Sequence, residues 1–222
     1  MAMVSISRLD PKEDYQASEA YKRLRTNVQL CGSDKKVILI TSTFPNEGKS
    51  TTAVNLAVSF AENEKKVLFI DADLRKSVLA GRYELDGGTK GLSLYLAGQV
   101  DMRQIFNHTN ISDLDMILAG HVMPNPAEML ARDAFDQLLD YARERYDYVI
   151  IDAPPINAVI DAAIIAPKCD GIVMVIAASA VTKKAALRVK QQLEKTGTPI
   201  LGAILNKVED GTDRYYGKYY GK

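Results

Sequence analysis

Cysteine and histidine are scarce in this sequence of 222 residues, which narrows the kinds of site that it can hold. The two cysteines, Cys31 and Cys169, are isolated and show no metal-ligand spacing, so we expect neither a disulfide framework nor a cysteine-bound metal. The two histidines, His108 and His121, lie in segments without other clustered ligand-type residues, and we interpret both as surface or loop residues. A reduced protein of the cytoplasm is the simplest interpretation.

An excess of charge and a long apolar segment are also missing. Lys plus Arg and Asp plus Glu both number 28, so the formal net charge is zero. Such a chain has no global attraction to nucleic acids or anionic membranes, and we expect no nucleic-acid partner. The longest apolar run, Ile172–Ala178, is far shorter than the roughly 20 residues that span a bilayer. The N-terminal stretch MAMVSISRLD lacks the apolar core of a signal peptide.

One segment, KVILITSTFPNEGKSTT from Lys36 to Thr52, has the layout of a phosphate-binding P-loop: strand, turn-rich loop, Gly-Lys-Ser and helix. Backbone N–H groups at the start of the helix would point at the phosphates. Lys49 would reach the β- and γ-phosphates, and the Ser50 hydroxyl would bind Mg²⁺. The motif departs from its usual form at Thr43, where a glycine is expected, so it needs support from other residues.

That support comes from carboxylates at the ends of two further apolar runs. Val67–Ile70 leads into Asp71 and Asp73, and Tyr148–Ile151 leads into Asp152. A single aspartate in such a place is more often a turn residue or a helix cap. Ligands of parallel α/β sheets, however, bind at the carboxyl ends of the strands, and three such ends together would form a site for ATP and Mg²⁺.

Apolar strands alternate with helical patterns along the chain, which predicts an α/β P-loop NTPase: a mostly parallel central sheet with helices on both faces. The strands are apolar at consecutive positions, as buried parallel strands are. We find no internal repeat and no interdomain linker, so residues 1–207 are expected to form one domain. The predicted strands are 37–42, 67–71, 114–118, 148–152, 171–177 and 200–205, and the predicted helices are 15–30, 49–64, 91–97, one near 101–107, 126–146, 161–166 and 182–196.

The C-terminal residues 208–222 differ in composition from this domain. Four of the 11 tyrosines lie in the last eight residues, YYGKYYGK, and glycines interrupt any strand or helix pattern. We therefore expect a flexible tail. It is either a low-complexity tail or a substrate tethered to an ATP-binding domain, with Tyr215, Tyr216, Tyr219 and Tyr220 as the phosphate acceptors.

With these motifs together, the chain resembles the bacterial tyrosine kinases (BY-kinases) of capsule and exopolysaccharide synthesis, in particular the separate cytoplasmic kinase subunit of Gram-positive bacteria. The resemblance extends from about Tyr15 to Lys222. It identifies Thr43–Ser50 as Walker A, Phe69–Arg75 as the A′ motif and Val149–Asp152 as Walker B. It implies an ATP- and Mg²⁺-dependent autokinase that phosphorylates its own C-terminal tyrosines and regulates polysaccharide synthesis and export.

The resemblance also implies roles for individual residues. Asp71 is the favoured base for the tyrosine proton, although the sequence alone does not separate it from Asp73. Arg75 would contact phosphate or pair with an acid, and Asn206 would contact the adenine. The expected catalytic residues are Lys49, Asp71, Asp73 and Asp152; the expected metal ligands are Ser50, Asp73 and Asp152; the expected nucleotide-binding residues are Pro45, Asn46, Glu47, Gly48, Lys49, Ser50, Thr51, Arg75 and Asn206.

The family has an N-terminal E-x-x-R-x-x-R motif whose helix packs subunits into a ring. Glu19, Lys22 and Arg25 fall on these positions, and Lys22 departs from the pattern because it lacks the bidentate fork of arginine. Without the resemblance, an ordinary charged helix face would be preferred. The family further implies a membrane activator (a polysaccharide co-polymerase) that recruits the kinase to the inner face of the membrane, and a cognate tyrosine phosphatase.

Two other functions are compatible with the P-loop. A partition- or division-type ATPase usually carries a second lysine early in the loop, and Thr41–Glu47 contains none. A catalytically silent nucleotide switch need not keep Lys49, Ser50 and all three aspartates. Both alternatives are therefore less favoured than the kinase.

Overall fold

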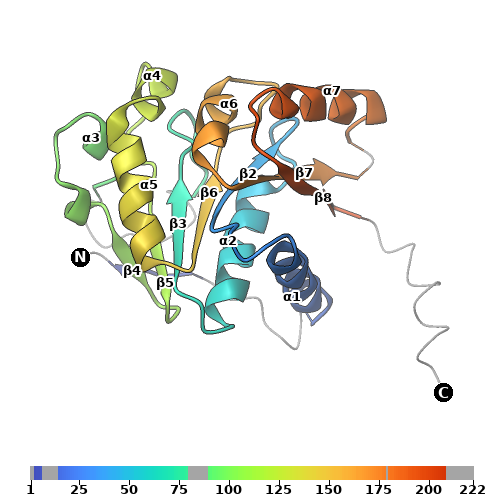
Figure 1. Cartoon of the computed structure of the whole chain (residues 1–222), viewed down its shortest axis with the longest axis horizontal. Coiled ribbons are helices and arrows are strands. Elements are labelled where there is room, and N and C mark those ends of the chain that lie inside the picture. Colours follow the sequence, from blue (N-terminus) through green and yellow to red (C-terminus); the bar gives the residue numbers. More distant parts are fainter. Residues whose placement is uncertain (1–2, 7–14, 80–89, 179, 209–222) are drawn as a thin grey trace.

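The computed structural model describes residues 3–6, 15–79, 90–178 and 180–208. Their strands form one eight-stranded sheet in the order β1-β4-β5-β3-β6-β2-β7-β8 (Figure 1). Neighbouring strands run parallel except for β4 and β5. The strands are β1 Met3–Val4, β2 Val37–Ser42, β3 Val67–Asp71, β4 Asn107–Thr109, β5 Leu114–Ile117, β6 Tyr148–Asp152, β7 Gly171–Ala177 and β8 Ile200–Asn206.

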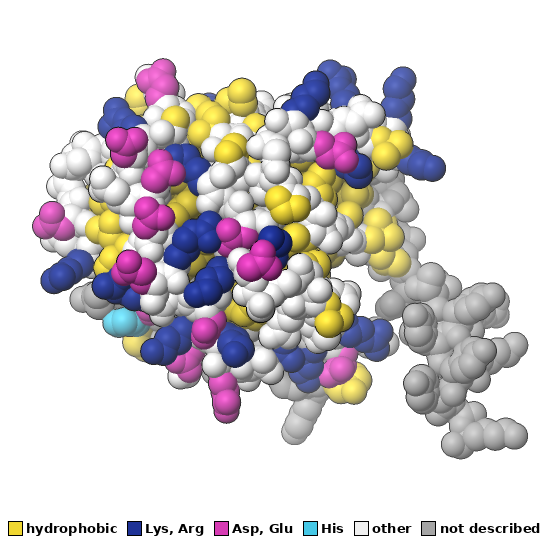
Figure 2. Space-filling view, viewed as in Figure 1, with side chains coloured by type: hydrophobic (Ala, Val, Ile, Leu, Met, Phe, Trp, Pro, Cys, Tyr) yellow, Lys and Arg dark blue, Asp and Glu magenta, His cyan; other side chains and the backbone are white. Residues whose placement is uncertain are grey.

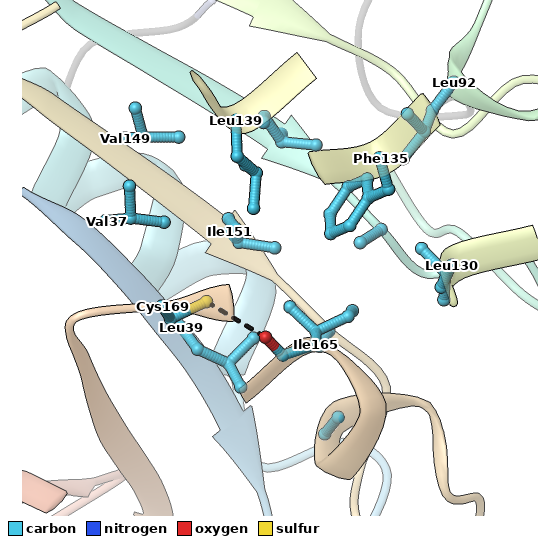
Figure 3. Close-up of a cluster of buried hydrophobic side chains, with 14 of the residues drawn as sticks. Val37, Leu39, Leu92, Leu130, Phe135, Leu139, Val149, Ile151, Ile165 and Cys169 are labelled. Atoms are coloured by element: carbon cyan, nitrogen blue, oxygen red, sulfur yellow. Dashed lines mark hydrogen bonds between the residues drawn. The ribbon is translucent and has the colours of Figure 1, made fainter. Parts of the chain in front are cut away.

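Helices cover both faces of the sheet, as predicted. On one face, α1 and α2 pack with one side of the strands into a cluster that includes Val28 and Phe60. On the other face, α3 to α7 form a second cluster with the opposite sides of the same strands, around Phe135 (Figure 3). The helices are α1 Tyr15–Leu30, α2 Lys49–Ala61, α3 Leu92–Leu96, α4 Pro126–Leu130, α5 Asp133–Arg145, α6 Asp161–Ile165 and α7 Lys183–Glu194, with short 3₁₀ helices at Met102–Gln104 and Ala166–Lys168.

The three central strands β3, β6 and β2 are buried almost throughout. This explains their continuous apolar sequences, because a parallel strand with helices on both faces has no solvent side. The edge strand β8 also has a largely apolar sequence, like the central strands, yet none of its residues is fully buried. The two strands with acidic ends, β3 and β6, and the P-loop strand β2 are neighbours at the buried centre of the sheet.

Two predicted elements were wrong in detail. The helix expected over 126–146 is broken at Arg132, whose extended backbone separates α4 from α5. Its guanidinium Nη1 donates to the carbonyl of Leu96 at 3.0 Å, a long-range contact that a periodicity argument does not contain. The helix expected near 101–107 is only a 3₁₀ turn, and Asn107–Thr109 forms β4 instead.

The surface matches the zero net charge of the sequence. Figure 2 shows Lys and Arg side chains interspersed with Asp and Glu over the visible face, without a large field of one sign. No helix within the described ranges is both long and apolar enough to cross a membrane.

Candidate active site

The sheet order places the three motif-bearing strand ends side by side. In the register of β6 with its neighbours, Asp152 lies opposite Ile40 of β2 and opposite Asp71 of β3. The P-loop leaves β2 and enters α2 at Lys49. The sequence-based prediction that these motifs meet at one edge of the sheet is therefore confirmed.

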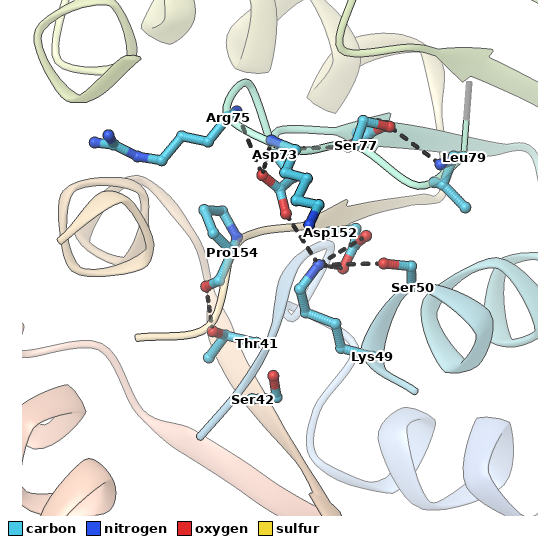
Figure 4. Close-up of polar contacts among 12 residues, drawn as sticks. Thr41, Ser42, Lys49, Ser50, Asp73, Arg75, Ser77, Leu79, Asp152 and Pro154 are labelled. Carbon is cyan, nitrogen blue, oxygen red and sulfur yellow. Dashed lines mark hydrogen bonds and ion pairs between the residues drawn. The ribbon is translucent and has the colours of Figure 1, made fainter. Parts of the chain in front are cut away.

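Lys49 is the centre of the polar cluster. Its Nζ lies 3.2 Å from Oδ1 of Asp152, 3.5 Å from Oδ2 of Asp73 and 3.2 Å from Oγ of Ser50 (Figure 4). Burial by itself would lower the pKa of Lys49, but the carboxylates of Asp152 and Asp73 outweigh it and raise this pKa. The ammonium group is therefore held in its charged form at the start of α2.

The backbone of the P-loop depends on Gly48. Its φ is +88°, a left-handed conformation that L side chains rarely adopt, and Asn46 is also left-handed at φ 66°. A Cβ on Gly48 would lie 2.2 Å from Nδ2 of Asn206, which itself donates to the carbonyl of Glu47 at 2.9 Å. Asn206 thus contacts the P-loop directly, and only glycine fits between them.

Glu47 has a bracing role that the sequence did not reveal. Its carboxylate is buried and accepts hydrogen bonds from the backbone N–H groups of Phe44 and Ala177, the latter at 2.9 Å. The side chain therefore ties the P-loop to the end of β7. Only the backbone of Glu47 remains to contact a nucleotide.

The two aspartates of the A′ segment have different surroundings. Asp73 lines the pocket next to Lys49, and its Oδ1 accepts from the backbone N–H of Lys76 at 3.0 Å. Asp71 lies deeper, where its carboxylate accepts from the Ser77 hydroxyl and from the N–H of Asp73. The structure thus separates two residues that the sequence left equivalent: Asp73 faces the pocket and Asp71 lies behind it.

The two deeply buried carboxylates are costly to ionise. Burial, together with the charge of Asp152, raises the pKa of Asp71 to about 7. Burial also raises the pKa of Asp152, although Lys49 partly opposes this. Buried ionisable groups with raised pKa values concentrate at functional sites, because packing alone would favour apolar residues there.

A pocket of about 340 Å³ opens beside this cluster. One wall is the P-loop, and the other consists of the segments that follow Asp73 and Asp152. Arg75 lies in that second wall, with its guanidinium paired to Asp161 of α6 by two contacts of 2.8 Å. The lining residues are Pro45, Asn46, Gly48, Lys49, Ser50, Thr51, Asp73, Arg75, Lys76, Val78, Pro154, Pro155, Ala158 and Val159.

Asp161 and Ser77 escaped the sequence analysis. Neither stands in a recognisable motif, and an aspartate that opens a short helix reads as an ordinary first-turn acid. Only the fold shows that Asp161 is fully buried and partnered by Arg75 of the A′ segment.

The expected oligomer-contact residues lie on α1, away from the pocket. Glu19 and Lys22 pair with each other at 2.7 Å on the helix surface. Arg25 donates from Nη1 to the carbonyl of Ser59 at 2.7 Å and so ties α1 to α2. The four predicted acceptor tyrosines, Tyr215, Tyr216, Tyr219 and Tyr220, lie outside the described residues.

Comparison with known proteins identifies the family. Residues 35–203, more than half of the chain, match the AAA domain family. The tyrosine-protein kinase CpsD of Streptococcus pneumoniae is 43% identical over 211 residues, which cover 93% of each chain. The tyrosine-protein kinase YwqD of Bacillus subtilis is 42% identical over 206 residues, covering 92% of this chain and 86% of its own. The chain belongs to the bacterial tyrosine kinase family.

Solved structures place this tyrosine kinase among kinase domains more closely than among division ATPases. The kinase domain of the Escherichia coli tyrosine kinase ETK is 33% identical with a TM-score of 0.82, covering 93% of this chain and 89% of that one. The septum site-determining protein MinD of Pyrococcus horikoshii, complexed with Mg-ADP, is 25% identical with a TM-score of 0.65, covering 77% and 69%. The shared P-loop NTPase fold is that of a nucleotide-binding protein, and the kinase interpretation is preferred over the partition-type ATPase.

Proposed function

We propose that this tyrosine kinase transfers the γ-phosphate of ATP to the tyrosines of its own C-terminal cluster, Tyr215, Tyr216, Tyr219 and Tyr220. The observation that supports this most strongly is the position of Lys49, charged and buried between Asp73 and Asp152 at the rim of the pocket. Phosphoryl transfer needs positioning and charge stabilisation more than covalent chemistry from the protein. A fixed ammonium group beside a P-loop supplies both.

In this proposal the phosphates of ATP bind on the loop from Pro45 to Thr51. The left-handed backbone at Asn46 and Gly48 supports it, because such conformations can form a nest of N–H groups that binds anions. On phosphate binding, Lys49 exchanges its carboxylate partners for phosphate oxygens. Asn206, which already contacts the P-loop, lies at the edge where the adenine is expected.

The residues present fit Mg²⁺. Ser50, Asp73 and Asp152 each bring a hard oxygen atom to within 3.5 Å of Nζ of Lys49, so the three oxygen atoms lie together beside the place proposed for the phosphates. This fits Mg²⁺, which is usually bound by one or two carboxylates together with substrate phosphates. When bound, the ion would neutralise charge on the β- and γ-phosphates.

The acceptor tyrosine must lose its proton, and by the family resemblance Asp71 is the base. A phenol has a pKa of about 10, so at neutral pH it arrives protonated. Asp71 lies beside Asp152 in the sheet register, at the back of the site that Asp73 lines. Ser77 and the N–H of Asp73 hold its carboxylate in one orientation.

The setting proposed for this kinase is the synthesis and export of capsular or exopolysaccharide at the inner face of the cell membrane. A separate membrane activator would recruit it, and a cognate phosphatase would reverse the reaction.

Glu19, Lys22 and Arg25 are the proposed ring contacts. Each phosphotyrosine adds about −1.5 to −2 charges, so phosphorylated tails should leave neighbouring sites and loosen the ring. Size-exclusion chromatography with light scattering, before and after ATP, would contradict this if complete phosphorylation left the assembly unchanged.

Mass spectrometry of intact protein and peptides, after incubation with ATP and Mg²⁺, tests the transfer itself. The expected result is phosphate on the segment from Tyr215 to Tyr220 in the wild type and at most a trace of it in Lys49→Met. ATP hydrolysis without any phosphotyrosine, both alone and with the co-expressed membrane activator, would contradict the proposal and favour a partition-type ATPase.

A further inference from the structure

Arg75 and Asp161 form an ion pair that joins the two segments leaving the acidic strand ends. Nε and Nη2 of Arg75 donate to the two carboxylate oxygens of Asp161, both at 2.8 Å, in the bidentate geometry that arginine favours. Asp161 is fully buried and Arg75 is about one-third exposed (37%). A buried carboxylate without its partner would be costly, so the pairing is strongly favoured.

The position of this pair relative to the Asp73 turn gives it a consequence for the site. Oδ1 of Asp73 accepts from the backbone N–H groups of Arg75 and Lys76, at 3.4 and 3.0 Å, while Oδ2 faces Lys49. The orientation of the Asp73 carboxylate therefore depends on where the backbone of Arg75 lies. In Figure 4 the Arg75 side chain extends away from the cluster around Lys49, so its guanidinium lies outside that cluster.

The segment on the other side of the pair is held as well. After Asp152 two hydrogen bonds tie the chain to β2. The Thr41 hydroxyl donates to the carbonyl of Pro154 at 2.9 Å, and the N–H of Ile156 donates to the carbonyl of Ser42 at 3.0 Å. Asp161 thus belongs to a segment that is anchored to the P-loop strand. The ion pair between Arg75 and Asp161 joins the A′ segment to this anchored segment.

We propose that Arg75 and Asp161 act as one positioning clamp, which holds the Asp73 carboxylate and the second pocket wall in the geometry needed for phosphoryl transfer. Arg75 then serves the reaction through Asp161 rather than by binding phosphate. Neither residue is catalytic in this account. The inference rests on the proposed nucleotide site. It predicts, however, that variants of the pair lose kcat while they keep their affinity for nucleotide.

Asp161→Asn removes the charge and keeps the size of the side chain, so the clamp is lost with little change in packing. We expect kcat for tyrosine phosphorylation to fall about 10- to 100-fold, since a displacement of about 1 Å at a reacting group can cost about 10²-fold. Affinity for a fluorescent ATP analogue should stay within about threefold, because the phosphate-binding loop is untouched. Arg75→Lys, which keeps the charge but loses the fork, should show an intermediate loss.

A double-mutant cycle decides whether the two residues act together. If they form one clamp, Arg75→Met combined with Asp161→Asn should be no slower than the slower single variant. Losses that multiply would overturn the proposal, because Arg75 would then have a role apart from Asp161, such as binding phosphate. A wild-type kcat in Asp161→Asn with only a lower unfolding temperature would overturn it too, since the pair would then be merely structural.

A matched control is present at the opposite end of the sheet. Nη1 of Arg143 pairs with Asp170 at 2.7 Å, far from the pocket, so Asp170→Asn should lower the unfolding temperature without changing kcat. ATP turnover and nucleotide binding are measured beside phosphotyrosine in every variant. If the wild type makes no phosphotyrosine, the proposed function fails, and the same cycle in ATP turnover still tests the clamp.

Discussion

The two ends of the central sheet use aspartate in opposite ways. At the amino end, Asp170 accepts hydrogen bonds from the backbone N–H groups of Lys36 and Val37 and from Arg143, all within 2.9 Å. Asp147 accepts in the same way from the N–H of Lys66 at 2.9 Å. Asp170 thus satisfies the N–H of Val37, the first donor of β2, and Asp147 satisfies the N–H of Lys66, directly before β3.

At the carboxyl end, Asp71 and Asp152 are buried beside each other. Burial is the main cause that raises the pKa of each. Burial would also raise the pKa of Asp170, but the hydrogen bonds from the Arg143 guanidinium and the Val37 N–H outweigh it and lower this pKa. The amino end is therefore built so that ionised carboxylates stabilise the fold, whereas the carboxyl end holds carboxylates at a cost in stability. Such a cost is expected where a site is prepared for phosphate and a cation.

The largest effect is expected for Lys49→Met. This change removes the ammonium group that lies within 3.5 Å of both Asp73 and Asp152, the only one to do so among the described residues. Phosphate transfer should fall by about 10²–10³-fold, as when a single charge-stabilising donor is removed from an active site. Initial rates of phosphotyrosine formation measure it. A rate within threefold of the wild type would show that the carboxyl-end cluster does not perform the chemistry.

Gly48→Ala tests the carboxyl end of the sheet through the P-loop, without removing any charged group. The left-handed φ should cost about 1–2 kcal/mol for any L side chain, and the new Cβ would also clash with Asn206. We expect nucleotide binding to be lost. Gly98→Ala is the matched control, because Gly98 has a similar φ of +72° with open space around it. It should share the loss of stability and leave nucleotide binding intact; equal binding by both variants would refute the clash.

The smallest effect concerns stability and pH at the amino end. Since the pKa of Asp170 is lowered in the folded protein, its ionised form stabilises the fold above its unfolded pKa of about 4, and this contribution is lost as pH falls through the folded value. Asp170→Asn should therefore cost about 1–3 kcal/mol near neutral pH and progressively less in acid. Urea unfolding between pH 3 and 7 measures the difference. If the difference in the free energy of unfolding between the wild type and Asp170→Asn grew in acid, the ionised carboxylate would not stabilise the fold as predicted.

Local sequence patterns predicted most of the fold because the buried parallel strands are continuous apolar runs. β2, β3 and β6 were placed to within a residue, and their order at the centre of the sheet brought Lys49 to Asp152 as expected. The break at Arg132 and the strand β4 escaped, because Arg132 contacts Leu96, 36 residues away in the sequence, and β4 pairs with β1, where Met3 lies opposite His108. The same holds in the site. Motif residues were found, whereas Glu47 as a brace and Asp161 as a partner of Arg75 exist only through the fold.

The most direct test of this account compares Asp152→Asn and Asp170→Asn, one variant from each end of the sheet, in the same two assays. The account predicts opposite results. Asp152→Asn should lose phosphate transfer and unfold at or above the wild-type temperature, whereas Asp170→Asn should keep transfer and unfold at a lower temperature. If Asp170→Asn lost transfer at temperatures where it remains folded, or if Asp152→Asn kept it, the division of labour between the two ends of the sheet would be contradicted.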